Sequence, residues 1–241
     1  MQCSARIGHV DAGCRPNWVG VLRYATCASS RRSTAIDSVY HRPMDGSPEV
    51  TAFILAGGKS TRMGSDKAFV EFDGRTLLAR VLDLARSVTQ DVRIVGSAEK
   101  FASFAPVVED IFRDCGPLGG IHAALRSSLS ELNVMLAVDT PFVSWTLLQY
   151  LISQARATPD AIIVVPASED RRQPLCAIYR REFADVAENA LRAGNNRIDR
   201  LFDLVKTRTI TEAELNVAGF SSGIFRNMNT PEELKTEEGR V

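Results

Sequence analysis

The sequence predicts an α/β protein built on one doubly wound, mostly parallel sheet. Short apolar runs alternate with segments of helical periodicity from residue 52 to residue 165. Such alternation is typical of parallel strands joined by right-handed helical crossovers. The near-continuous apolar run at residues 133–138 is expected for a central strand that helices cover on both faces. No internal repeat or linker divides residues 50–241, so we expect a single domain there.

Each predicted element follows from its periodicity and its flanking residues. Residues 76–88 and 144–156 each place an apolar stripe on one face of a helix. Pro231 stands at a first helical turn, where proline is tolerated, and predicts a terminal helix. The remaining expected helices span 116–128, 181–192 and 196–204, and the expected strands span 52–55, 92–95, 107–108, 133–138, 161–165, 173–179 and 207–210.

Residues 1–49 differ in composition from the rest of the chain. They are rich in arginine and serine and hold three of the five cysteines. They contain no continuous apolar segment, so a secretory signal is not expected, and their four acidic residues weaken the case for a transit peptide. We expect this segment to be a disordered or non-native extension, with Met44 as a natural alternative start, and residues 50–241 to be the functional domain.

The charge balance and the spacing of metal-binding side chains argue against several functions. Lysine and arginine total 29, aspartate and glutamate also total 29, and the formal net charge is zero. This balance gives no reason to expect nucleic-acid or acidic-membrane binding, and no apolar run approaches the roughly 20 residues that span a bilayer. The three histidines and five cysteines form no cluster with the spacing of zinc ligands. So few cysteines suit a reducing cytoplasm, where we expect the protein to act.

The stretch from Leu55 to Lys67 carries the strongest chemical signal in the chain. It follows the first apolar strand and precedes a helical pattern, so we expect it on a strand-to-helix turn. Gly57 and Gly58 let the backbone turn sharply and expose N–H groups, with no Cβ to block an incoming phosphate. A glycine turn at the end of a strand is therefore a candidate phosphate site.

Three cations strengthen that interpretation. Lys59, Arg62 and Lys67 lie within nine residues of one another. Arg62 presents a planar fork to phosphate oxygens, whereas Lys67 is a point charge that neutralises a departing pyrophosphate. The alternative is a glycine-rich surface turn with solvated cations, an alternative that applies most strongly to Lys59.

Neither of the common nucleotide-binding fingerprints matches this stretch. Residues 58–60 read like the end of a P-loop, but Phe53 stands where that motif needs its first glycine. The three-glycine spacing of dinucleotide-binding proteins is also incomplete. The turn therefore belongs to another class of nucleotide site.

The stretch closely resembles the signature of the molybdenum cofactor guanylyltransferases and their relatives among sugar-nucleotide pyrophosphorylases. That signature reads Leu-Ala-Gly-Gly, a short polar spacer into Arg-Met-Gly, then Asp-Lys, and every part is present in order. With Gly-Pro-Leu-Gly-Gly at 116–120 and Asn-Thr-Pro-Glu-Glu-Leu at 229–234, the resemblance covers about residues 51–236. It implies the nucleotidyltransferase (Rossmann-like) fold, with the nucleotide contacted by Leu55, Ala56, Gly57, Gly58 and Lys67.

Several further polar and glycine residues follow predicted strands. Gly96, Asp110, Gly116 and Asp139 stand directly after strands or in the loops that come next. In a doubly wound sheet, ligands collect at the carboxyl ends of the strands. We therefore expect these residues to converge on one edge of the sheet together with the Leu55–Lys67 stretch.

Asp139 is the candidate ligand for Mg²⁺, which neutralises triphosphates. Mg²⁺ takes hard oxygen ligands, commonly one or two carboxylates with phosphates and water. The alternative is a helix N-cap or a turn residue ahead of Pro141. The resemblance implies that Asp139 is the metal ligand, and it places an asparagine of the closing segment, Asn229, near the metal or the acceptor. The alternative for Asn229 is a cap at the start of the last helix.

The resemblance also implies contacts to the nucleoside. Asp110 takes the position of an aspartate that contacts the nucleotide, and Gly116 permits close approach of the base. Gly96 stands where some relatives carry an asparagine that touches the nucleotide. Glycine offers only backbone there, which leaves the base preference open. The alternative for Asp110 and Gly116 is a structural role in the turns before the next helix.

The activity implied by the resemblance is the transfer of GMP from GTP to the molybdenum cofactor (molybdopterin), giving molybdopterin guanine dinucleotide and pyrophosphate. Arg62, Lys67 and Asp139 are the expected catalytic residues, Mg²⁺ the expected cofactor, and molybdoenzyme maturation proteins the expected partners. Two alternatives stay open. One is the same chemistry with another base or acceptor, such as cytidylyl transfer to the cofactor or transfer to a sugar phosphate. The other is a non-catalytic nucleotide-binding subunit.

Overall fold

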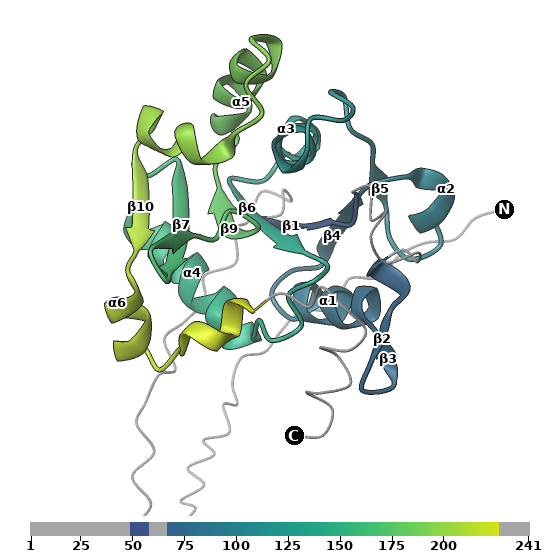
Figure 1. Ribbon diagram of the computed structural model, residues 1–241, viewed down its shortest axis with the longest axis horizontal. Helices are drawn as coiled ribbons and strands as arrows, with labels where there is room; N and C mark the ends of the chain where they lie inside the picture. The colour runs from purple at the N-terminus through teal and green to yellow at the C-terminus, as the bar shows by residue number, and fades with distance from the viewer. Residues whose placement is uncertain (1–48, 58–66, 227–241) are drawn as a thin grey trace, which may run out of the picture. The chain divides into compact units, whose positions relative to one another are not determined.

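The computed structural model describes residues 49–57 and 67–226. The predicted N-terminal extension at 1–49, apart from Glu49, and the helix predicted from Pro231 lie outside these ranges. None of the helices within them is long and apolar enough to cross a membrane. The described part of the domain is an α/β structure with one large, mostly parallel sheet, which confirms the predicted fold class (Figure 1).

The strands of the large sheet follow the order β10-β7-β9-β6-β1-β4-β5. β1 pairs in parallel with β6 and β4, and β4 pairs in parallel with β5. β9 runs antiparallel between β6 and β7, and the short β8 pairs antiparallel with β7. The bounds are β1 Val50–Leu55, β4 Asp91–Val95, β5 Val107–Val108, β6 Leu132–Ala137, β7 Ile163–Ser168, β8 Arg171–Arg172, β9 Cys176–Tyr179 and β10 Thr207–Ile210.

Helices cover both faces of this sheet. α1, α4 and α6 pack against one face, and α3 and α5 pack against the other (Figure 1). β1 and β6, which are buried along their whole length, lie between these two layers, as their near-continuous apolar sequences require. The bounds are α1 Leu77–Arg86, α2 Ala98–Phe101, α3 Pro117–Ser127, α4 Trp145–Ala157, α5 Phe183–Arg192 and α6 Glu212–Val217.

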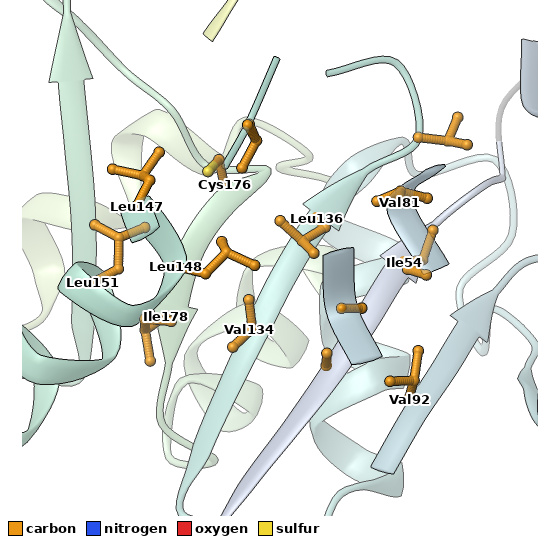
Figure 2. Packing of buried hydrophobic residues seen from close by; sticks show 14 of the residues in the cluster. Ile54, Val81, Val92, Val134, Leu136, Leu147, Leu148, Leu151, Cys176 and Ile178 are labelled. Carbon is orange, nitrogen blue, oxygen red and sulfur yellow. The ribbon is translucent and has the colours of Figure 1, made fainter. Parts of the chain in front are cut away.

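Two clusters of buried apolar side chains hold the layers together. In the first, Leu148 of α4 packs toward Val134 and Leu136 of β6, with Ile54 of β1 and Val81 of α1 beyond them (Figure 2). The second lies between α3, α5 and the opposite face of the same strands. Because alternate residues of a strand point to opposite faces, each central strand contributes to both clusters. Packing on both faces fixes the position of each central strand, and therefore the point at which the strand ends.

The segment between the first strand and the first helix differs from the prediction. A 3-10 turn, Lys67–Phe69, and a small hairpin of β2 (Glu71–Phe72) and β3 (Arg75–Thr76) precede α1. The Leu55–Lys67 stretch therefore does not open the helix directly, and the predicted strand-to-helix turn is wrong in that respect. Strands of two residues are too short to show a period in the sequence.

Residues 196–204 also differ from the prediction of a single helix. They form two separate 3-10 turns, Ile198–Arg200 and Phe202–Leu204. Ile198 and Phe202 are buried in the second apolar cluster, so packing rather than helix periodicity places them. The short helix α6 was not predicted. It begins at a capping box, in which the Thr211 hydroxyl accepts from the Glu214 N–H and the Glu214 carboxylate accepts from the Thr211 N–H.

Candidate functional site

Four parallel strands end at one edge of the sheet, and the predicted site residues follow them. β1 and β6 are in register to their last residues, Leu55 and Ala137, and β1 and β4 are in register to Leu55 and Val95. Val95 in turn pairs with Val108, the last residue of β5. The residues that follow these strand ends therefore share this edge, as predicted: Gly57 after β1, Gly96 after β4, Asp110 after β5 and Asp139 after β6.

The turn after β1 is tied to the neighbouring strand. The N–H groups of Ala56 and Gly57 both donate to the Val95 carbonyl, at 3.0 and 3.2 Å. These two amides are thus already paired with the sheet edge. A Cβ built on Gly57 would meet its nearest atom, the same carbonyl oxygen, at an ordinary 3.8 Å. The predicted exposure of the Gly57 N–H to a phosphate is therefore not seen, and Gly58 and Arg62 lie outside the described residues.

Lys67 and Asp139 form an ion pair across this edge. The Lys67 Nζ lies 3.2 Å from the Asp139 Oδ2, although the residues are 72 positions apart in the sequence. Their side chains are 25% and 22% exposed, so the pair opens to solvent on one side. The contact joins the phosphate stretch to the end of the central strand.

Asp139 is not a helix cap. The N-cap of α4 is Ser144, whose hydroxyl accepts from the Leu147 N–H at 3.3 Å. The turn after β6 is held instead by Thr140, whose Oγ1 donates to the Ala137 carbonyl at 3.1 Å. The capping role that the sequence allowed for Asp139 is therefore excluded, and its carboxylate lies at this sheet edge beside Lys67.

Asp110 carries a carboxylate in an unusual environment. Its Oδ1 atom is buried and accepts no hydrogen bond from the residues that the structure describes. Burial raises the pKa of this carboxyl above its ordinary value. A buried acceptor without a partner costs free energy. The described part of the chain does not offset this cost.

Helix α3 begins beside Asp110 and packs unusually close to the sheet. Gly116, its N-cap, has φ 64° and ψ −156°, a conformation that favours glycine. A Cβ built on Gly120 would lie 3.2 Å from the Leu55 side chain, 3.3 Å from the Val95 side chain and 3.6 Å from the Asp110 Oδ1. Gly120 thus lets the first turn of α3 approach β1, β4 and Asp110 together. This role was not predicted, and the paired glycines in the first turn of an apolar helix were the signal for it.

Gly119 is the most crowded glycine of the described residues. A Cβ built there would lie 2.7 Å from the Phe112 carbonyl oxygen, a backbone atom that cannot move away cheaply. We expect Gly119→Ala to lower the free energy of unfolding by about 1–3 kcal/mol, since it overpacks a buried contact. Urea denaturation of the purified protein measures this. Gly223→Ala is the control, because its Cβ would meet its nearest atom at 3.9 Å; an equal loss in both variants would contradict the packing account.

Not every predicted site residue belongs to the described part of the chain. Asn229, the second predicted metal ligand, lies outside the described residues. The described residues contain no group of three or more histidine, cysteine, aspartate or glutamate side chains arranged to hold a metal ion. Leu55, Ala56, Gly57, Lys67, Gly96, Asp110, Gly116 and Asp139 are all described, and they lie at the strand ends or in the loops and turns that adjoin this edge.

Comparison with known proteins identifies the family of this chain. A family model for the MobA-like NTP transferase domain matches residues 52–209. The molybdenum cofactor guanylyltransferase of Desulfosudis oleivorans is 36% identical over 195 residues, covering 80% of this chain and 96% of the relative. A probable molybdenum cofactor guanylyltransferase of Flavobacterium johnsoniae is 32% identical over 187 residues, covering 77% and 94%.

Solved structures agree. The molybdopterin-guanine dinucleotide biosynthesis protein A of Archaeoglobus fulgidus superposes with a TM-score of 0.69 and 28% identity, covering 79% of this chain and 97% of that chain. The 2-C-methyl-D-erythritol 4-phosphate cytidylyltransferase of Thermus thermophilus, at 19% identity and a TM-score of 0.59 over 80% and 100%, shares the fold. The chain belongs to the MobA-like NTP transferase family, within which it is similar to the molybdenum cofactor guanylyltransferases.

Proposed function

We propose that this protein transfers GMP from GTP to the molybdenum cofactor, forming molybdopterin guanine dinucleotide and pyrophosphate. The observation that carries the proposal is the Lys67–Asp139 pair, 3.2 Å apart at the carboxyl end of the central strand. It joins a cation for phosphate and a carboxylate for a metal at the edge where doubly wound sheets bind nucleotides. The guanylyltransferase relatives, similar over nearly their full length, support the choice of substrates.

The chemistry needs positioning and charge neutralisation more than acid–base catalysis. An oxygen of the acceptor's phosphate attacks the α-phosphorus of GTP in line, and the bond from that phosphorus to the bridging oxygen breaks. The electron pair leaves with pyrophosphate. A phosphate monoester is already ionised near neutral pH, so no strong base is required. The Lys67 ammonium stabilises the negative charge that develops on the departing group.

The residues at this edge fit a magnesium ion. Mg²⁺ is commonly held by one or two carboxylates, substrate phosphates and several waters, rather than by a cage of protein ligands. Asp139 supplies one accessible carboxylate, whose oxygen atoms are hard ligands of the kind that Mg²⁺ prefers. When bound, Mg²⁺ would neutralise and orient the triphosphate. Lys67, which contacts one oxygen of the same carboxylate, fixes how Asp139 presents its other oxygen.

Asp110 is proposed to recognise the base. Guanine carries adjacent N–H donors on its Watson–Crick edge, and a carboxylate accepts from such donors. The buried Oδ1 of Asp110 has no hydrogen-bond partner in the described part of the chain, so a guanine would remove the cost of its burial. This supports GTP over a nucleotide that presents fewer donors at that point.

Asp110→Asn tests this role. We expect the dissociation constant for GTP to rise by about tenfold or more, because a charge-assisted hydrogen bond is lost. The free energy of unfolding should not fall. Burial raises the pKa of the Asp110 carboxyl in the folded state, so the ionised carboxyl disfavours folding above that pKa. The neutral amide of asparagine removes this cost. GTP binding to the wild type should weaken as pH falls through the raised pKa, because protonation removes the charge of the accepting carboxylate.

Calorimetric titration with GTP and urea denaturation provide the two measurements. The control is Glu109→Gln, which makes the same charge change one residue earlier on an exposed side chain. Equal GTP affinities for the wild type and Asp110→Asn would remove Asp110 from the base site.

The decisive experiment is a panel of the four nucleoside triphosphates with Mg²⁺ and molybdenum cofactor, read by pyrophosphate release. Release with GTP alone supports the proposal. Release with CTP, or with a sugar phosphate as acceptor, would replace it by the same chemistry on other substrates. Absence of release with every nucleotide would favour a non-catalytic nucleotide-binding subunit.

We further propose that the protein acts in the cytoplasm and passes its product to molybdoenzyme maturation proteins. The support is chemical: Cys115 and Cys176 are free thiols, as a reducing compartment favours, and a cofactor dinucleotide has use only when inserted into an apoenzyme. Co-purification with such proteins from cells that make molybdoenzymes, and fractionation of those cells, would test both points.

A further inference from the structure

Phe101, the last residue of α2, lies directly behind the turn that follows β4. Its side chain is 1% exposed. A Cβ built on Gly96 would lie 3.0 Å from the Phe101 Cε2 and 3.1 Å from its Cδ2. Such distances are tighter than about nine in ten real contacts of a Cβ atom, so a side chain at position 96 would require the ring to shift by a few tenths of an ångström. The ring therefore fills the space that a residue-96 side chain needs.

The other side of that space is also bounded. The Gly57 backbone nitrogen would lie 3.5 Å from the same Cβ, and the Gly96 N–H donates to the Val108 carbonyl at 3.0 Å. Gly96 is thus held between the turn after β1 and the end of β5. The Phe101 ring therefore packs against the backbone of this turn from the remaining side.

The same ring reaches toward Lys67. Phe101 stacks on Phe69, with ring centroids 5.9 Å apart and an interplanar angle of 23°. Phe69 is the last residue of the 3-10 turn that begins with Lys67. Lys67 in turn contacts Asp139. One aromatic side chain therefore contacts both the turn at Gly96 and the segment that presents the lysine.

Simple hydrophobic anchoring is a competing account. α2 has four residues, too few to be stable as a helix alone, so Phe101 must help to hold it against the domain. Anchoring alone predicts that substitutions change the free energy of unfolding, and that the effects of substitutions at positions 96 and 101 on GTP binding are independent. A role in the site predicts instead that position 96 and position 101 are coupled in nucleotide binding. The two accounts are therefore separable.

We propose that Phe101 is a positioning residue of the nucleotide site. It acts through Gly96, by packing against the turn that follows β4, and through Phe69, by fixing the turn that carries Lys67. The inference rests on the proposed function, because it assumes that a nucleoside triphosphate binds at this edge.

A double-mutant cycle of Gly96→Ala and Phe101→Leu tests the first contact. Gly96→Ala should raise the dissociation constant for GTP with Mg²⁺ by about tenfold, because the displaced ring moves the β4 turn. Phe101→Leu removes the ring, so adding it to Gly96→Ala should recover most of the lost affinity. Strictly additive effects in titration calorimetry would overturn the proposal.

A pair of exposed phenylalanines tests the second contact without risk to the fold. Phe69 is 42% exposed and Phe104, which also contacts Phe69 at 5.9 Å, is 43% exposed. Phe69→Leu should lower kcat about fivefold to tenfold with little change in the KM for GTP, since it loosens the Lys67 turn. Phe104→Leu should leave both parameters near those of the wild type. Equal effects of the two substitutions would overturn the link to Lys67.

The wild-type protein separates the failure of this inference from that of the proposed function. If it binds none of the four nucleoside triphosphates, the proposed function and this inference both fall. If it binds GTP and releases pyrophosphate while the cycle is additive and Phe69→Leu is silent, the function stands and the positioning role of Phe101 is rejected.

Discussion

Replacing Asp139 by asparagine is expected to lower kcat by about a thousandfold, because transition-state stabilisation by a bound metal is worth several kcal/mol. The asparagine amide keeps the shape of the side chain but loses the negative charge that would hold Mg²⁺. The fold should survive. With side chains 25% and 22% exposed, the Lys67–Asp139 pair contributes about 1 kcal/mol or less to stability.

Two measurements check this expectation. Pyrophosphate release at saturating GTP and molybdenum cofactor gives kcat, and electron paramagnetic resonance of Mn²⁺ in the presence of GTP reports metal binding directly. Asp139→Asn should lose both. The matched control is Asp160→Asn, which breaks an exposed ion pair with Lys206 of 2.8 Å. Retention of Mn²⁺ binding and of activity within about tenfold would show that Asp139 is not the metal ligand.

Lys67→Met should lower kcat by about a hundredfold to a thousandfold, comparable to the loss of one preorganised group that stabilises developing charge. Methionine retains the length and apolar stem of lysine but no charge. Unlike Asp139→Asn, this variant should still bind Mn²⁺, because the carboxylate remains. Lys67→Arg should recover only part of the activity, since a planar guanidinium does not fit the place of a compact ammonium beside Asp139.

The same assays apply, with Lys206→Met as the control for loss of a paired lysine elsewhere on the domain. Stability should change little, for the reason given for Asp139. If Lys67→Met keeps its kcat and only the KM for GTP rises, Lys67 binds the ground state and transition state equally and has no special part in the chemistry. An unchanged kcat and KM would favour a non-catalytic protein.

The fold was predictable because its central elements are long and strongly patterned. β1 and β6 are almost uniformly apolar, and α1 and α4 carry clear apolar stripes. The failures are short or irregular elements. The β2–β3 hairpin has two residues a strand, and residues 196–204 form two turns whose shape depends on packing. Short segments have no period to detect, and tertiary contacts decide their conformation.

The sequence was sufficient to predict which residues share the site edge, because the strand topology places them there. Gly57, Gly96, Asp110 and Asp139 each follow a strand, and the carboxyl ends of parallel strands share an edge. What could not be predicted depends on how segments far apart in the sequence pack and pair. The antiparallel course of β9, which pairs beside β6, is one example, since an apolar run does not encode the direction in which it will pair.

By itself, the sequence determined the fold class, the long central strands and helices and the residues that follow the strand ends at the nucleotide edge, because these follow from local periodicity and from the geometry of parallel sheets. Tertiary structure alone decided the 3.2 Å contact between Lys67 and Asp139, the burial of the Asp110 Oδ1 and the packing of Phe101 against Gly96. Each depends on how closely two segments pack, and close packing is a property of the whole core.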